Sequence, residues 1–284
     1  MKRKKICFVV PSLGTARVFL LNHIKELNLY FDIYLVASIE KEALIYFKDI
    51  PLKKIKNIAI SRAINPIRDF RTLVSLSAYF REMNFDAVHT VTPKVGLLGI
   101  LAARLAGIDK RIHIFTGQVW YTKKGWFKRF LMLLDRFTVL NSTHILVDGQ
   151  SQRQFLIKNS IVKKTSSLVL GKGSISGADT NRFVPDIIVK KEVREELRIK
   201  ENEVVFMFLG RMNIDKGINE LAEAFNKVRK KHVNARLLLV GGDEENMTPI
   251  VKQKVKDIES VLFYGVTPLP ERLLQACDVF CMPS

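Results

Sequence analysis

Short apolar runs alternate with longer stretches of helical periodicity along the whole chain. In the first part of the sequence, the short runs predict strands at residues 6–10, 33–38, 57–60, 87–92, 111–116, 144–148 and 167–170. The stretches between them predict helices at residues 68–83, 94–106, 125–140 and 152–158. Such alternation is typical of a parallel sheet whose strands are joined by crossover helices.

A second series of the same kind begins after residue 200. Strands are predicted at residues 204–209, 236–240, 261–264 and 278–282, with a first helix at residues 217–231. Between the two series lies GKGSISGADTNRFVPD, rich in Gly, Ser, Asp and Pro, followed by a charged helical stretch at 190–198. Such a composition indicates a linker. The predicted fold class is therefore α/β, with Rossmann-like domains at 1–172 and 189–284, a linker at 173–188, and two parallel sheets that face a cleft.

The bulk composition is that of an ordinary globular protein. The chain has 284 residues, 48% of them apolar, which is enough to bury a core. Its three cysteines are too few for a disulfide framework, and the Cys277/Cys281 pair lacks the second ligand pair that a zinc site needs. The apolar run near the amino terminus is too short for a secretory signal, and no run reaches the roughly twenty residues that span a bilayer. These features predict a cytoplasmic protein.

The positive charge is concentrated in the first part of the chain. Of the net charge of +18, residues 1–170 contribute +17, from 28 Lys and Arg against 11 Asp and Glu. Such a one-sided field attracts anionic lipid headgroups, a phosphorylated acceptor or nucleic acid. A generally basic proteome is the alternative explanation. No nucleic-acid-binding motif or aromatic stacking platform occurs, so nucleic acid is not expected as a partner.

The segment VVFMFLGRMNIDKG, residues 204–217, holds the most informative pattern. A buried strand runs into a glycine and then places Arg211 and Lys216 just before a helix. Backbone N–H groups at a helix N-terminus favour anions, and two cations add charge-assisted bonds, so this geometry suits a diphosphate. A solvated Gly-Arg turn with a nearby lysine remains the alternative.

Several motifs together resemble a known enzyme family. LGRMNIDKG, the linker positions Gly177, Ala178, Asp179, Asn181 and Phe183, and the strand at 280–284 resemble the retaining GT-B glycosyltransferases of family four. The segments IFTGQVWYTKKG, ILVDGQSQRQFLI and VLGKGSISGAD are similar to those of bacterial members that build capsular or O-antigen polysaccharide on a polyprenyl diphosphate. The resemblance extends from Lys4 to Ser284.

The resemblance implies an enzyme with a specific reaction. We expect a retaining hexosyl- or N-acetylhexosaminyltransferase that moves a sugar from a nucleoside diphosphate donor, UDP-linked, to a polyprenyl-diphosphate-linked saccharide. Arg211 and Lys216 match the family's catalytic pair, whose charges stabilise the departing diphosphate. No cofactor is implied, and no metal is required, because the sequence has no Asp pair or His-rich spacing suited to magnesium or manganese.

Glycines at the ends of the second series of strands are candidates for the donor pocket. Close backbone approach to the nucleotide base and ribose is the predicted role, and an ordinary tight turn is the alternative for Gly242. The predicted donor-binding residues are Gly210, Gly241, Gly242, Asp243, Gly265 and Val266.

Acceptor-side candidates follow the strands of the first domain. Family members often have two glycines in the loop after the first strand, where this chain has only Gly14, with Thr15 beside it. Family members often have a histidine in the loop after the fifth strand, where this chain has Thr116 and Gly117. His89 matches a frequent family histidine, with a satisfied buried histidine as the alternative. The predicted acceptor-side residues are Gly14, Thr15, His89, Lys94, Thr116 and Gly117.

One helical stretch combines aromatic and basic residues. A helix of this composition suits a lipid interface, so the inner face of the cytoplasmic membrane is a predicted partner and the protein is expected to be peripheral on it. A core helix packed on the sheet is the alternative. The predicted lipid-contacting residues are Lys123, Lys124, Trp126, Lys128, Arg129 and Phe130.

The resemblance also suggests a missing segment. In the family, a glutamate pair and a terminal helix follow the position of Ser284, so we expect an incomplete second domain with exposed apolar surface beside its last strand. The rival hypothesis is therefore a catalytically inactive remnant that binds nucleotide-sugar or membrane.

Overall fold

The structure is a computed structural model that describes residues 3–48, 50, 52–61 and 63–284. The chain divides into two compact units, residues 1–177 and residues 178–284, which we call the first and second unit. The break between Gly177 and Ala178 falls inside the stretch predicted as a linker. Each unit contains one parallel sheet with helices on both faces, so the predicted α/β fold class is confirmed.

The first unit is built on a seven-stranded parallel sheet in the order β3-β2-β1-β4-β5-β6-β7. Its strands are β1 (Lys5–Ser12), β2 (Asp32–Ser38), β3 (Lys54–Asn57), β4 (Ala87–Val91), β5 (Lys110–Phe115), β6 (His144–Val147) and β7 (Ser167–Leu168). In β1, an interior strand of this sheet, Ile6 lies opposite Ile33 of β2 and Ala87 of β4. Residues 7–10 are fully buried, as expected for a strand that is covered on both faces.

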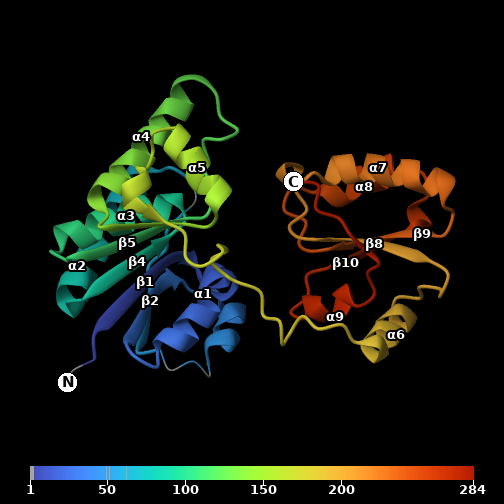
Figure 1. Ribbon diagram of the computed structural model, residues 1–284, viewed down its shortest axis with the longest axis horizontal. Helices are drawn as coiled ribbons and strands as arrows, with labels where there is room; N and C mark the ends of the chain where they lie inside the picture. The colour runs from blue at the N-terminus through green and yellow to red at the C-terminus, as the bar shows by residue number, and fades with distance from the viewer. Residues whose placement is uncertain (1–2, 49, 51, 62) are drawn as a thin grey trace. The chain divides into compact units, whose positions relative to one another are not determined.

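Helices cover the two faces of this sheet unequally. The helices are α1 (Leu13–Leu27), η1 (Lys41–Phe47), α2 (Pro66–Met83), α3 (Pro93–Leu105), α4 (Gly125–Asn141), α5 (Gln150–Lys158) and η2 (Lys164–Ser166). α1 and η1 pack on one face, whereas α2, α3, α4 and α5 pack on the other (Figure 1). α1 begins directly after β1 because the Ser12 hydroxyl accepts a hydrogen bond of 3.2 Å from the Thr15 amide.

Two sequence-based predictions for the first unit are wrong. The strand predicted at residues 57–60 lies earlier, because β3 ends at Asn57 and pairs only with β2 at the sheet edge. Ile58 and Ile60 pack against the core after the strand has ended, so their hydrophobicity reflects burial in a loop. The turn predicted as a loop around Gly14 is the first turn of α1.

The second unit has a four-stranded parallel sheet in the order β10-β9-β8-β11. Its elements are α6 (Ile187–Glu196), β8 (Val204–Leu209), η3 (Ile214–Lys216), α7 (Ile218–Lys231), β9 (Ala235–Val240), α8 (Met247–Lys254), η4 (Ile258–Ser260), β10 (Val261–Gly265), α9 (Pro270–Leu274) and β11 (Val279–Phe280). α7 and α8 pack on one face and α6 and α9 on the other (Figure 1). β11 is shorter than the predicted strand 278–282. Val279 and Phe280 are exposed, which confirms the expected apolar surface beside the last strand.

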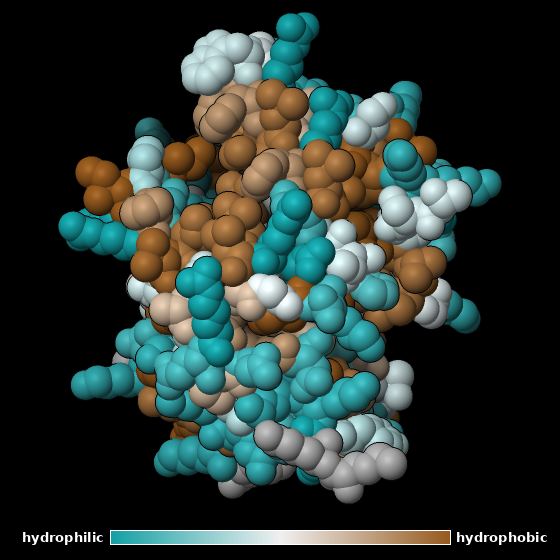
Figure 2. Space-filling view, turned by 90° about the vertical axis from the view of Figure 1, so that its left-hand side faces the viewer, coloured by the Kyte–Doolittle hydropathy of each residue, from teal (hydrophilic) through white to brown (hydrophobic). Residues whose placement is uncertain are grey.

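Two helices of the first unit carry stripes of exposed apolar side chains. One stripe of α4 consists of Trp126, Phe130, Leu133, Phe137 and Leu140, which are 40 to 78% exposed. A second stripe on α2 consists of Ile67, Phe70 and Val74. In Figure 2, apolar side chains gather over the upper half of the face, and polar side chains surround them and fill the lower half. Among the helices that the structure describes, none is both long and apolar enough to cross a membrane.

Candidate functional site

The carboxyl ends of β8, β9 and β10 meet through direct backbone hydrogen bonds. The Gly210 amide donates to the Val240 carbonyl at 2.9 Å, and the Gly241 amide donates to the Gly265 carbonyl at 2.8 Å. Two residues beyond the Gly210–Val240 bond, the Met212 amide donates to the Gly242 carbonyl at 2.8 Å. Three separate turns therefore form one continuous edge, and the predicted donor-side glycines are neighbours in space.

Gly241 is required by this backbone contact. Its φ of 140° is unfavourable for any residue with a Cβ, and a Cβ built there would lie 1.8 Å from the Gly210 carbonyl oxygen. Gly265 has a φ of 80°, whereas a Cβ on Gly242 would lie 3.5 Å from the Val266 side chain. The sequence predicted that a ligand approaches the backbone closely at Gly241. In the structure, the Gly210 carbonyl of the chain itself makes this close approach.

The loop after β8 displays the two predicted cations. Arg211 is exposed, and Lys216 ends the short helix η3, which is capped by Asn213 through a 3.1 Å bond from the Lys216 amide to the Asn213 side chain. Gly217 then adopts a φ of 69° and starts α7. A Cβ on Gly217 would lie 2.9 Å from the Pro283 ring, so the segment after β11 packs against this loop. Within the described residues, no hydrogen bond or ion pair reaches the Lys216 ammonium.

Two glutamates that the sequence analysis missed face this loop. Arg211 Nη1 donates to both carboxylate oxygens of Glu244, at 2.7 and 3.0 Å, and the Asn213 amide nitrogen donates to the same carboxylate at 3.2 Å. The adjacent Glu245 accepts a 2.9 Å bond from the Ile214 amide. The carboxylates of Glu244 and Glu245 thus occupy the places where an anionic ligand would bind Arg211 and the Ile214 amide. The acidic run after Gly242, directly following a strand, is the signal that would have found them.

Asp243 has a structural task that sequence analysis did not foresee. Its carboxylate accepts bonds of 2.6 Å from the Met247 amide and 2.9 Å from the Thr248 amide, at the start of α8. Desolvation opposes the charged form, but the hydrogen bonds from Thr248 and Met247 outweigh it and hold the pKa of Asp243 below its usual value. Both oxygens are engaged by the protein, so Asp243 caps a helix in this structure.

The acceptor-side candidates Gly14 and Thr15 lie in the first turn of α1. The Gly14 amide donates a 2.9 Å bond to a carboxylate oxygen of Glu40, a further acidic residue that the sequence analysis missed. The Thr15 amide donates to Ser12, as described above. In this turn, too, an acidic side chain engages a backbone amide at the carboxyl end of a strand.

The remaining acceptor-side candidates separate between the two faces of the first sheet. His89 packs 5.1 Å from the Phe8 ring, on the α1 face, and contributes to a cavity of about 60 Å³ that also contains His23. Burial and the neighbouring His23 lower the pKa of His89 to about 4, so His89 is neutral at pH 7. Lys94 begins α3 on the opposite face and lines a different cavity. The structure therefore does not bring His89 and Lys94 into one pocket.

Thr116 and Gly117 follow β5 directly and open a loop that leads to α4. A Cβ on Gly117 would meet no atom within 4 Å, so the space beside this residue is free. Trp120, further along the loop, is almost fully buried and donates a 2.7 Å bond to the Asp135 carboxylate in α4. This buried pair anchors the loop on the helix side of the sheet.

Comparison with known proteins identifies the family. Residues 5–148 match the family profile described as "Glycosyl transferase 4-like", which is slightly more than half of the chain. Residues 189–284 match a second profile, "Glycosyl transferases group 1". The chain belongs to the glycosyl transferase 4-like family.

Individual relatives and structures agree with this glycosyl transferase 4-like assignment. The capsular polysaccharide biosynthesis glycosyltransferase CapM of Staphylococcus aureus is 29% identical over 75% of this chain and 54% of its own length. The Escherichia coli UDP-Gal:alpha-D-GlcNAc-diphosphoundecaprenol alpha-1,3-galactosyltransferase is 28% identical over 90% of this chain and 66% of its own length. The chain thus spans about half to two thirds of the length of these relatives.

A solved structure supports the fold of this glycosyl transferase 4-like chain. Anabaena HepE, crystallised in complex with UDP and glucose, superposes with a TM-score of 0.74 over 98% of this chain and 73% of its own length. Since the two sequences are only 14% identical, the similarity shows the fold alone. The predicted GT-B-like fold class is confirmed at this level.

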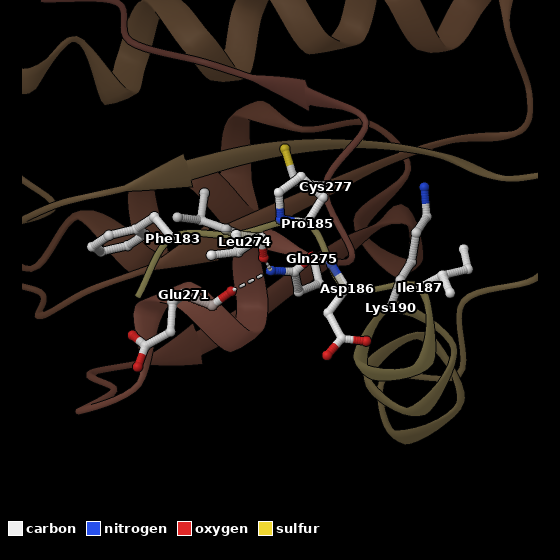
Figure 3. A pocket seen from close by; sticks show the side chains of 10 residues that line it. Phe183, Pro185, Asp186, Ile187, Lys190, Glu271, Leu274, Gln275 and Cys277 are labelled. Carbon is white, nitrogen blue, oxygen red and sulfur yellow. Dashed lines mark hydrogen bonds between the residues drawn. The ribbon is translucent and has the colours of Figure 1, made fainter. Parts of the chain in front are cut away.

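A wide groove in the second unit lies apart from the predicted donor residues of this glycosyl transferase 4-like chain. It has a volume of about 650 Å³ and runs between α9 and the segment that leads into α6. In Figure 3, Phe183 and Leu274 form an apolar side, while Glu271, Asp186 and Lys190 extend at the margin. None of the predicted donor-site residues lines this groove. Among the residues described in either unit, no group of three or more His, Cys, Asp or Glu side chains is arranged to hold a metal ion.

Proposed function

We propose that this chain provides both Rossmann-like lobes of a retaining glycosyltransferase of surface polysaccharide synthesis. The donor is a UDP-sugar, and the acceptor is a saccharide linked to polyprenyl diphosphate. The single observation that carries the proposal is the loop after β8, where the exposed Arg211 and the half-buried Lys216 stand on an edge formed by three glycine turns. The Escherichia coli relative is named as acting with UDP-Gal, and HepE was crystallised in complex with UDP. Both names support the choice of donor.

In this proposal, Arg211 and Lys216 bind the donor diphosphate. As the bond between the sugar and the β-phosphate breaks, negative charge grows on the departing oxygen. Fixed cations at that oxygen stabilise the transition state more than the ground state, and loss of one such donor commonly costs about 100- to 1,000-fold in turnover. In this proposal, the nucleotide lies beside Gly242 and the exposed Val266, on the glycine edge.

The carboxylate of Glu244 must leave Arg211, or share it, when the diphosphate binds. The Arg211 and Glu244 side chains are 50% and 41% exposed, so their ion pair is solvated and contributes only about 1 kcal/mol or less. A diphosphate offers more charge and more acceptor oxygens than a single carboxylate. Exchange of one anion for the other is therefore energetically accessible.

The first unit supplies the acceptor side of the proposed reaction. Its excess of 18 positive charges, from 29 Lys and Arg against 11 Asp and Glu, attracts the anionic membrane surface and the lipid-linked diphosphate. Lys123, Lys124, Lys128 and Arg129 surround the start of α4, whose Trp126 and Phe130 are exposed. An amphipathic arrangement of this kind suits peripheral attachment to a lipid surface.

The proposal is tested with radiolabelled UDP-sugars and a polyprenyl-diphosphate-linked saccharide. We expect transfer to the lipid-linked acceptor, and we expect Arg211→Ala and Lys216→Ala each to reduce it by about 100-fold or more. Arg229→Ala is the matched control, because Arg229 also pairs with a carboxylate, Asp257 at 2.8 Å, but lies in the last turn of α7. Absence of transfer with every UDP-sugar, or equal losses in Arg211→Ala and Arg229→Ala, would contradict the proposal.

A further inference from the structure

A cavity of about 190 Å³ opens among α2, α3, α4 and the loop that follows β5. Its lining residues come from four stretches of the chain: Ile64 and Asp69; Pro93, Lys94 and Leu97; Val119 and Trp120; and Phe127, Leu131, Leu134 and Asp135. The first three stretches follow the carboxyl ends of β3, β4 and β5. The cavity therefore lies at the edge of the first sheet where α/β proteins bind their ligands, next to the predicted acceptor-side residue Lys94.

The polar side chains that line this cavity already have partners. Lys94 forms an ion pair with Asp69 at 2.7 Å and donates a further hydrogen bond to the Ala63 carbonyl. Asp135 accepts the indole N–H of Trp120 at 2.7 Å. Because a buried water needs two to four polar partners, a cavity whose polar groups are paired with one another favours an apolar guest.

The size of the cavity limits that guest. An engineered cavity of about 150 Å³ accommodates benzene, so a cavity slightly larger than that takes roughly one or two five-carbon units of a branched chain. The aromatic faces of Trp120 and Phe127 and the branched ends of Leu97, Leu131 and Leu134 match such a chain in shape and polarity.

The surroundings of the cavity identify the head group of the guest. Lys123, Lys124, Lys128 and Arg129 stand at the start of α4, which has no acidic residue in its first turn. The Lys128 ammonium lies 5.6 Å from the ring of Trp120, the aromatic wall of the cavity. An apolar cavity with cations beside it is complementary to an apolar chain that ends in a phosphate group.

The exposed stripes of α4 and α2 indicate how such a chain arrives. Figure 2 shows apolar side chains gathered on one face of the first unit. Cations next to exposed aromatic and aliphatic residues suit the interface of an anionic membrane. A chain held in that membrane would therefore have a short apolar path into the cavity.

We propose that this cavity binds the first isoprenoid units of a polyprenyl diphosphate while the cations of α4 contact its phosphates. The identity of the guest rests on the proposed function, because that function requires a lipid-linked acceptor. The proposal assigns to the protein a contact with the lipid part of the acceptor, in addition to contacts with its saccharide.

Tryptophan fluorescence gives a direct readout. The chain has two tryptophans, of which Trp120 lines the cavity and Trp126 lies on the exposed stripe. In Trp126→Phe, all tryptophan emission comes from Trp120. We expect farnesyl diphosphate to change this emission saturably, while inorganic diphosphate at the same concentration leaves it unchanged. No response to farnesyl diphosphate, or an equal response to inorganic diphosphate, would overturn the proposal.

A matched pair of variants locates the site. Leu97→Phe fills the cavity, whereas Leu133→Phe makes the same change on the exposed stripe of α4. In the Trp126→Phe background, we expect Leu97→Phe to weaken farnesyl diphosphate binding at least tenfold and Leu133→Phe to leave it within twofold. Leu134→Phe fills the cavity from α4 and replaces Leu97→Phe if circular dichroism shows that variant to be unfolded. Equal binding by the filled and control variants would place the chain elsewhere.

Vesicles separate the isoprenoid from other apolar partners. Phosphatidylglycerol vesicles that contain undecaprenyl phosphate should change the emission of Trp120, and vesicles of phosphatidylglycerol alone should not. An equal change with both would assign the cavity to a phospholipid acyl chain and overturn the proposal. Isoprenoid binding without sugar transfer would refute the proposed function alone. Normal transfer to a long-chain acceptor by a cavity-filled variant would refute this inference alone.

Discussion

The turn after β1 and the turn after β8 hold equivalent positions in their two sheets and differ in what surrounds them. In both turns, a carboxylate accepts a hydrogen bond from a backbone amide at the carboxyl end of a strand. Glu40 accepts the bond from the Gly14 amide, and Glu245 accepts the bond from the Ile214 amide. The turn after β1 leads at once into α1, whereas the turn after β8 forms a short helix and displays Arg211 and Lys216. The topology thus provides, at both places, a backbone amide that donates a hydrogen bond to an anion. Only the turn after β8 adds two cations suited to a diphosphate, the exposed Arg211 and the half-buried Lys216.

The two units also use the carboxyl edges of their sheets differently. In the second unit, backbone hydrogen bonds join the glycine turns at this edge, and the edge carries polar side chains such as the exposed Arg211. The edge of the first unit contains an apolar cavity with a buried Trp120–Asp135 pair. The proposed division between a nucleotide-binding edge and a lipid-binding edge accounts for both arrangements, and the following experiments test it from the largest expected effect to the smallest.

The largest effect is expected from Gly241→Ala. The new methyl group would lie 1.8 Å from the Gly210 carbonyl oxygen and would force an unfavourable φ of 140°. We expect a loss of at least about 3 kcal/mol in the free energy of unfolding, measured by urea denaturation. Gly117→Ala in the first unit is the control, because its Cβ meets no atom within 4 Å and its stability should be unchanged. A tolerated Gly241→Ala would show that the backbone contact between β8 and β9 is not rigid.

An intermediate effect is expected from the buried acid of the first unit. Burial raises the pKa of Asp135 from 3.8 to about 6, although the hydrogen bond from Trp120 opposes the shift. The folded state therefore holds a proton that the unfolded state releases, and Asp135 makes the protein less stable as the pH rises from about 4 to about 6.

Asp135→Asn removes this dependence and keeps an acceptor for Trp120. By thermal unfolding, we expect a gain approaching roughly 3 kcal/mol at pH 8, since each unit of pKa shift corresponds to about 1.4 kcal/mol, and a smaller gain at pH 5. Asp243→Asn in the second unit is the comparison, because hydrogen bonds hold the pKa of Asp243 low, and it should give no gain at pH 8. A gain for Asp135→Asn that does not change with pH would contradict the assigned ionisation.

The smallest effect is expected from Glu244→Gln. Removing the charge that pairs with Arg211 frees the guanidinium for a diphosphate, so UDP should bind about two- to fivefold more tightly, in line with a solvated ion pair. Glu259→Gln removes the same charge from the exposed turn that precedes β10 and should leave UDP binding unchanged. If Glu244→Gln weakens UDP binding, Glu244 positions Arg211 instead of competing for it.

Local patterns predicted much of this molecule. The apolar strands, the restart of the α/β series after the linker and the placement of Arg211 and Lys216 before a helix all follow from short-range periodicity and turn composition. The sequence-based analysis also identified the two interpretations of the helix at 125–140. The structure shows Leu131 and Leu134 lining an internal cavity, as the core interpretation expects, whereas Trp126 and Phe130 are exposed and their contact with lipid stays a prediction.

The features that could not be predicted depend on contacts distant in sequence. Glu244 meets Arg211 across 33 positions, and Glu40 meets Gly14 across 26. The cavity of the first unit is formed by four stretches that no local pattern relates. β3 was misplaced because an edge strand can be half-exposed and charged while the buried residues after it, Ile58 and Ile60, look more like a strand.

A titration of UDP and uridine into the protein and into Arg211→Ala tests the central claim most directly. If Arg211 holds the donor diphosphate, the protein binds UDP far more tightly than uridine. Arg211→Ala should then lose about tenfold to 100-fold in affinity for UDP, as expected for a charge-assisted hydrogen bond, while uridine binds both proteins equally. Equal affinity of the protein and of Arg211→Ala for UDP would contradict the account.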